Sequence, residues 1–117
     1  LCATEGVFER SESAVRLTPS LEAADVATRT KAVATVTEAL RDRGVVSGWR
    51  DELVPVSVGF GSEPKFLVER AAYPLLGTAG YGVHVNGYVR DGETMRLWIG
   101  KRSSAKPTWP GLLDHLV

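Results

Sequence analysis

The chain has 117 residues, of which 44% are hydrophobic and 24% are charged, as in an ordinary globular domain. Fourteen Lys and Arg residues balance fourteen Asp and Glu residues, so the net charge is zero. A nucleic-acid-binding domain normally carries a basic excess, and a membrane span needs roughly 20 apolar residues in a row. The sequence has neither feature, so it predicts no nucleic-acid partner and no membrane partner, and it excludes a disordered tail.

The cysteine content and the two ends give further expectations. Cys2 is the single cysteine, which excludes an internal disulfide and favours a reducing, cytoplasmic location. The chain begins with Leu1 and has no signal-peptide pattern. It ends in an apolar run at residues 112–117, whereas domains usually end in polar residues. We therefore expect a piece of a longer protein.

The first part of the chain predicts two short strands and a helix. Strands are expected at residues 7–10 and 14–18, and Pro19 marks a break or the start of a helix. The main helix is expected at residues 27–43, ending at Gly44. Its buried face consists of residues at helical spacing, which are Val33, Val36 and Leu40.

Glycine and aromatic residues are concentrated after residue 44, and this part predicts strands and turns. Strands are expected at residues 49–58, 66–68, 83–90, 95–102 and 112–117, with a helical turn at 70–76. A hairpin turn is expected at Asp91 and Gly92. The chain has no phosphate-binding P-loop, no His-Glu-x-x-His motif and no nucleophile elbow, so it contains no complete catalytic constellation.

A series of short motifs in the second part resembles a known family. The motifs are Glu-Arg-Ala-Ala (69–72), Gly-Val-His-Val-Asn-Gly-Tyr-Val (82–89), Leu-Trp-Ile-Gly-Lys-Arg-Ser (97–103), Lys106, Trp-Pro-Gly (109–111) and Leu-Asp (113–114). In this order they closely resemble the thiamine-diphosphate-related branch of the Nudix hydrolases, which is related to thiamine pyrophosphokinase. The resemblance covers residues 28–117.

The resemblance implies an α+β fold in two parts. Residues 1–80 would form a small accessory N-terminal domain of strands and a helix. Residues 81–117 would form the opening strands of a Nudix α/β/α sandwich. The family's Nudix box (G-x5-E-x7-R-E-U-x-E-E-x-G-U), whose glutamates hold Mg²⁺ or Mn²⁺, does not occur in this chain. The metal ligands and catalytic glutamates are therefore expected downstream of Val117, and the fragment alone is expected to be inactive.

The resemblance also implies a function for the whole protein. It would hydrolyse an organic diphosphate, such as a thiamine diphosphate analogue, to a monophosphate with Mg²⁺, and its partner would be that small molecule. Two alternatives stay open, an enzyme similar to isopentenyl diphosphate isomerase and a non-catalytic module that recognises a ligand or a protein. The sequence leaves the oligomeric state undetermined.

Three residues are candidates for binding the substrate. A diphosphate needs cationic donors, and Arg102 and Lys106 follow a predicted strand in a loop. Their pattern, Arg-Ser-x-x-Lys-x-x-x-Pro-Gly, also resembles isopentenyl diphosphate isomerase, in which the matching Arg and Lys contact the diphosphate. Trp109 could stack on a heteroaromatic ring. The alternatives are a solvated pair of cations and a tryptophan that packs the loop against the strands.

Three further residues are candidates for lining the cleft. His84 and Asn86 lie on the polar face of a predicted strand, which is either the wall of the cleft or the solvent side of the sheet. Arg70 and the preceding Glu69 either orient the cleft or form an ion pair that anchors the short helix. No metal ligand is expected within the chain.

Overall fold

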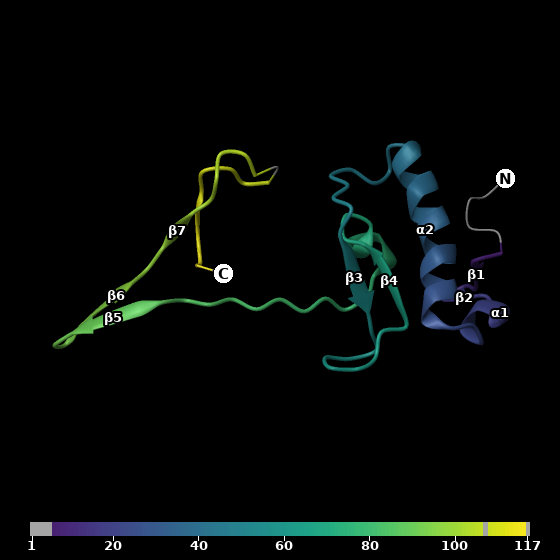
Figure 1. Cartoon of the computed structure of the whole chain (residues 1–117), viewed down its shortest axis with the longest axis horizontal. Coiled ribbons are helices and arrows are strands. Elements are labelled where there is room, and N and C mark those ends of the chain that lie inside the picture. Colours follow the sequence, from purple (N-terminus) through teal and green to yellow (C-terminus); the bar gives the residue numbers. More distant parts are fainter. Residues whose placement is uncertain (1–5, 107, 117) are drawn as a thin grey trace. The chain divides into compact units, whose positions relative to one another are not determined.

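The structure is a computed structural model that describes residues 6–106 and 108–116 (Figure 1). It separates into two compact units, an N-terminal unit that ends at Ala79 and a C-terminal unit that begins at Gly80. Every strand pair in the described residues is an antiparallel pair, and these pairs are combined with helices. This combination confirms the predicted α+β class.

The N-terminal unit begins with a hairpin and a short helix. Strand β1 (Phe8–Arg10) pairs with β2 (Val15–Leu17), so that Phe8 lies opposite Leu17 and Arg10 lies opposite Val15. Helix α1 (Pro19–Glu22) follows directly, with proline at a position where a helix tolerates it. Both predicted strands are confirmed, and Pro19 marks the start of a helix.

Helix α2 (Val26–Asp42) is the main element of this unit and begins one residue before its predicted start. Asp25 caps it by accepting a hydrogen bond from the Thr28 backbone N–H at 2.7 Å. Hydrogen bonding by the Thr28 side chain, together with that from the Thr28 backbone N–H, lowers the pKa of the Asp25 carboxyl below its usual range. Val33 and Val36 are buried, which confirms the predicted apolar face of the helix.

Strands β3 (Leu53–Val56) and β4 (Phe66–Glu69) form the second antiparallel pair, followed by the 3₁₀ helix η1 (Tyr73–Leu76). Strand β4 packs along α2. Its Leu67 backbone N–H, which points away from β3, donates to the Thr30 hydroxyl of α2 at 2.9 Å. This bond fixes the helix to the sheet edge, where the backbone donor would otherwise be unpaired.

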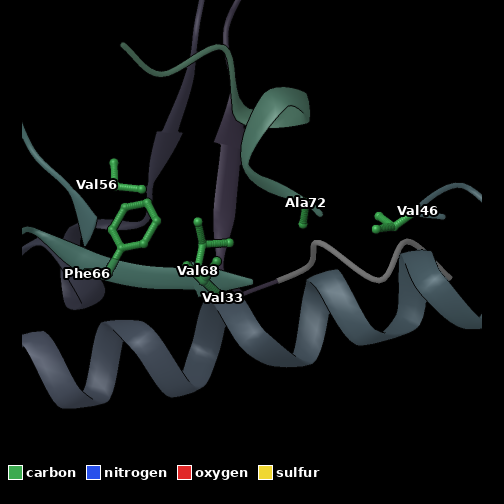
Figure 2. Close-up of a cluster of buried hydrophobic side chains, with 6 residues drawn as sticks. All are labelled: Val33, Val46, Val56, Phe66, Val68 and Ala72. Carbon is green, nitrogen blue, oxygen red and sulfur yellow. The ribbon is translucent and has the colours of Figure 1, made fainter. Parts of the chain in front are cut away.

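The hydrophobic core lies where this strand pair meets the helix (Figure 2). Its buried side chains are Val33, Val46, Val56, Phe66, Val68 and Ala72. Figure 2 shows the Phe66 ring between Val56 and Val68, and Val33 of α2 belongs to the same buried cluster. The hairpin covers this core through Phe8 and Leu17, which pack against it. The N-terminal unit is therefore a layered domain with one core.

A buried carboxylate organises the end of β4. Glu69 is 3% exposed, and it accepts backbone hydrogen bonds from Arg50 at 3.1 Å, Glu52 at 3.2 Å and Ala71 at 3.0 Å. The adjacent Arg70 pairs with Glu52, and one guanidinium nitrogen lies 2.9 Å from each carboxylate oxygen. Glu69 thus binds backbone donors, while Arg70 makes its ion pair elsewhere.

The C-terminal unit contains two short antiparallel pairs. Strand β5 (Tyr88–Asp91) pairs with β6 (Thr94–Leu97), and β7 (Gly100–Lys101) pairs with β8 (Leu113–Asp114). The hairpin at Gly92 is confirmed. The strands are shorter than predicted, because only single backbone hydrogen bonds, such as Trp98 N–H to the Gly87 carbonyl at 2.9 Å, are formed beyond their ends. Val117, at the end of the last predicted strand, lies outside the described residues.

The side chains of the C-terminal unit are open to solvent. None of residues 80–106 and 108–116 is buried, and apolar side chains such as Val83, Met95 and Trp98 are more than half exposed. A two-stranded pair without a covered face has marginal stability. In the part of the chain that the structure describes, no helix has the length and apolar character needed to cross a membrane.

Candidate functional site

The loop between β7 and β8 holds the predicted substrate-binding residues. We define this β7–β8 loop as residues 102–112. Its ends are tied together, because the Arg102 N–H donates to the Leu112 carbonyl at 2.9 Å and the Gly111 N–H donates to the Arg102 carbonyl at 3.2 Å. Gly111 has a φ of 72°, in the left-handed region that glycine adopts easily. These two backbone hydrogen bonds hold the two ends of the loop next to each other.

Arg102 is held across the base of this loop. Its Nη1 donates to Asp114 Oδ2 at 2.6 Å, and its Nε and Nη2 donate to the Thr108 carbonyl at 3.3 and 3.0 Å. The side chains of Arg102 and Asp114 are 26% and 29% exposed, so the pair is partly shielded from water. The guanidinium is thereby fixed in position, with part of its donor set left for another acceptor.

Asp114 is kept ionised by its neighbours. The hydrogen bond from Arg102 holds the pKa of the Asp114 carboxyl below its usual range, against the opposing effect of desolvation. The backbone N–H of His115 also donates to Asp114 Oδ1, at 3.0 Å. An ionised Asp114 keeps the guanidinium of Arg102 oriented across the base of the loop.

Protonation of Asp114 is expected to release Arg102. A carboxyl whose pKa is lowered by folding stabilises the fold above its unfolded pKa, and that stability is lost as the pH falls through the folded pKa. The pair should therefore persist at neutral pH and open only below about pH 4, the ordinary pKa of an aspartate. An NMR titration of the Arg102 Nε–H resonance measures this transition. A midpoint near pH 6 would contradict the conclusion that Asp114 holds Arg102 in place.

Lys106 and Trp109 lie in the same loop with their side chains exposed. Lys106 forms no ion pair with any residue that the structure describes, and its backbone N–H donates to the Ser103 carbonyl at 3.2 Å. Trp109 is 71% exposed, and its φ of 52° is uncommon for a residue with a bulky side chain. The structure brings Arg102, Lys106 and Trp109 into one loop, with the aromatic ring and the ammonium group open to solvent.

The two histidines contact each other in the C-terminal unit. His84 Nδ1 lies 2.5 Å from His115 Nε2, and the two rings meet edge to face. His115 Nε2 also lies 3.2 Å from Asp114 Oδ1, which links the histidine pair to the Arg102 site. Asn86 lies two residues from His84 and is exposed. His84 thus lies near the β7–β8 base, as one member of a pair.

Arg70 belongs to the N-terminal unit, where it pairs with Glu52. The other candidates belong to the C-terminal unit. Among the described residues no group of three or more His, Cys, Asp or Glu side chains could hold a metal ion. The described residues therefore do not form a divalent-metal site by themselves.

Sequence reasoning missed the residues that position Arg102. Asp114 and Thr108 are 12 and 6 residues away from it and hold its guanidinium. Asp114 falls within the Leu-Asp motif, which was the available signal. An acidic residue at one end of the loop can reach an arginine at the other end only if the strand register brings the two ends together. In this structure Asp114 lies opposite Gly100, so the register places Asp114 close to Arg102.

Comparison with known families identifies the class of this protein. Residues 1–80 match the model of a family described as "Domain of unknown function (DUF4743)". This match covers more than half of the chain, so the chain belongs to that family.

Two of the relatives are named as Nudix hydrolases. The chain is 57% identical over 90 residues to Nudix hydrolase 20, chloroplastic, and 56% identical over 90 residues to Nudix hydrolase 24, chloroplastic, both of Arabidopsis thaliana. Each alignment covers 76% of this chain and 24% of the relative. An uncharacterized protein of Saccharomyces cerevisiae is 43% identical over 74 residues, which is 62% of this chain and 21% of that protein. The chain thus spans about a quarter of the length of these relatives.

These comparisons bear on two expectations. The predicted relationship to Nudix hydrolases is confirmed, while its thiamine-related branch stays a prediction. The expectation of a cytoplasmic protein is wrong, because both plant relatives are named as chloroplastic. A single cysteine reports only on redox conditions, and several compartments share those conditions.

Proposed function

We propose that this chain is part of a Nudix-type hydrolase that cleaves an organic diphosphate, and that its β7–β8 loop binds the diphosphate group. The observation that carries the proposal is the identity of 57% with Nudix hydrolase 20 over 90 residues. The position of Arg102, fixed by Asp114 and Thr108 in the loop that also carries the exposed Lys106, supports the role of the loop.

The reaction sets the chemistry that the loop must provide. Water attacks a phosphorus atom of the diphosphate, the bond to the bridging oxygen breaks, and a monophosphate ester and phosphate are formed. The substrate carries several negative charges, which cationic donors must offset. Arg102 offers the guanidinium N–H donors that Asp114 and Thr108 leave free, and Lys106 offers a mobile point charge.

We also propose a divalent metal, Mg²⁺ or Mn²⁺, for the complete protein. When bound, it would polarise the phosphoryl oxygens and help to activate water. The part of the chain described here lacks an acidic cluster for it. Its ligands are therefore proposed in the segment that follows Val117, and the residues of this chain bind and orient the substrate.

The proposed substrate is a diphosphate with a flat heteroaromatic group, such as a thiamine diphosphate analogue. The exposed ring of Trp109, in the same loop as the two cations, supports this class. An aromatic side chain stacks on a flat ring and gains free energy from the contact. A diphosphate with an aliphatic group would gain much less from the same tryptophan.

Substitution of the two cations tests the proposed site. In the full-length protein, Arg102→Gln and Lys106→Gln are each expected to raise the KM for a thiamine diphosphate analogue about tenfold, since each removes a charge-assisted hydrogen bond. Lys101→Gln is the matched control. Lys101 ends β7, directly before the loop, and its substitution is expected to change KM less than about twofold. Unchanged KM values in both test variants would contradict the site.

A second comparison separates the ring contact from the charge contacts. Trp109→Ala is expected to raise KM for the thiamine analogue and to leave KM for isopentenyl diphosphate unchanged. Isomerisation of isopentenyl diphosphate without release of phosphate would instead identify an isomerase.

A further inference from the structure

The N-terminal unit contains a cavity that the proposed hydrolysis does not use. Its volume is about 540 Å³, and it lies between the β1–β2 hairpin, α2 and η1. Its lining is largely apolar and includes Leu17, Val36, Leu40, Val56, Phe66 and Leu76. Cavities that bind small molecules usually have 300–1,000 Å³ and a mostly apolar lining with a few polar groups. The cavity falls within that class.

The mouth of the cavity keeps apolar side chains in contact with water. Val15 is 66% exposed and Leu75 is 54% exposed, and both line the cavity. Val15 lies on β2 of the hairpin, and Leu75 lies on η1. Removing such side chains from water stabilises a bound apolar group by about 25 cal/mol for each Å² buried. The apolar part of a ligand would therefore enter here.

An arginine lies on the same face of the hairpin as the apolar lining. Because side chains alternate along a strand, Arg10 shares a face with Phe8 and lies opposite Val15 in the register. Arg10 lines the cavity and forms no ion pair with any described residue. An arginine among apolar side chains without an acidic partner is a suitable site for an anion.

The nearby acidic residue does not neutralise Arg10. Glu9 also borders the cavity, but it lies on the other face of β1, opposite Arg16 in the register. The cross-strand neighbour of Glu9 therefore has the opposite charge. This arrangement leaves the positive charge of Arg10 available at the mouth.

A buried hydroxyl without a partner lies in the cavity wall. Thr78 Oγ1 is shielded from solvent and makes no hydrogen bond in the described structure, and Thr78 lines the cavity. Most buried polar atoms in proteins have a partner, so an orphan hydroxyl calls for an explanation. A polar atom of a ligand in the cavity would give this hydroxyl the partner that it lacks.

We propose that this cavity binds a small amphipathic organic anion. The ligand class is an apolar ring or branched chain with one carboxylate, sulfonate or phosphate group, which Arg10 would bind while the apolar part fills the cavity. This gives the unit that belongs to the family of unknown function a ligand-binding role, and it is independent of the proposed hydrolysis.

The test uses two fluorescent probes that differ in one group. The anionic probe is 8-anilinonaphthalene-1-sulfonate, and its uncharged counterpart is N-phenyl-1-naphthylamine. We expect the full chain to bind both at a saturable site. Arg10→Gln is expected to weaken binding of the sulfonate about tenfold, the loss of a charge-assisted hydrogen bond, and to change binding of the uncharged probe less than twofold.

Two further variants separate this site from general apolar binding. Arg16→Gln, on the other face of the hairpin, should leave the affinity for both probes unchanged. Val15→Glu, at an exposed position opposite Arg10, should occupy the guanidinium and weaken binding of the sulfonate as Arg10→Gln does. Equal affinity for the sulfonate in the original chain, Arg10→Gln and Val15→Glu, or the absence of any saturable site, would overturn the proposal.

Discussion

Truncation of Phe66 to alanine is expected to lower the free energy of unfolding of the N-terminal unit by about 3–5 kcal/mol. Phe66 is 8% exposed and belongs to the same buried cluster as Val56 and Val68 (Figure 2). Its removal loses the transfer free energy of the ring and leaves a cavity that rigid strands cannot close. The unit has one small core, so this loss approaches its total stability.

Chemical denaturation followed by circular dichroism measures this effect. Phe60→Ala is the control, because Phe60 is 80% exposed and truncation there should cost less than about 1 kcal/mol. The m-value should stay the same if the folded state keeps its compactness. A loss below 1 kcal/mol for Phe66→Ala would contradict the placement of the core.

Replacement of Glu69 by alanine is expected to lower the free energy of unfolding by about 3 kcal/mol. The carboxylate is buried and accepts hydrogen bonds from three backbone N–H groups, those of Arg50, Glu52 and Ala71. Alanine would leave these donors without an acceptor. Glutamine keeps one oxygen but places an NH₂ group against a backbone donor, so Glu69→Gln should have an intermediate effect.

The adjacent ion pair provides the control for Glu69. Arg70 and Glu52 are 53% and 50% exposed, and an exposed pair contributes less than about 1 kcal/mol. Arg70→Ala should therefore have a much smaller effect than Glu69→Ala in the same denaturation experiment. An equal loss of unfolding free energy in the two variants would contradict the role of the buried Glu69 carboxylate at the end of β4.

The local parts of the N-terminal unit could be predicted because their causes are local. Helix α2 follows from the spacing of Val33, Val36 and Leu40, and its C-terminal end follows from Gly44. The β1–β2 hairpin follows from two short alternating segments separated by polar residues. Each of these signals lies within one element, so a single sequence is enough to find it.

The positions of the buried polar groups depend on contacts between distant segments. Glu69 binds N–H groups 17 and 19 residues earlier in the chain, and Arg102 binds an aspartate 12 residues later. No spacing rule connects such residues before the register is known. Arg102 could be identified as a candidate through a motif, whereas its partners Asp114 and Thr108 required the structure.

The strands of the C-terminal unit illustrate a different limit. Alternating apolar residues predict a strand over residues 83–90, but the structure has strand only from Tyr88. Alternation indicates which side chains would share a face, and a strand also needs a partner for its backbone groups. Within the described residues, β6 provides that partner only from Thr94 to Leu97.

The most direct test of the proposed hydrolase is turnover by the full-length protein that contains this chain. Release of phosphate from thiamine diphosphate analogues and other organic diphosphates would be measured with Mg²⁺, with EDTA, and after Mg²⁺ is restored. We expect phosphate release that stops with EDTA and returns with the metal. Binding of these diphosphates without any release of phosphate, with Mg²⁺ or Mn²⁺, would contradict the hydrolase and identify a recognition module.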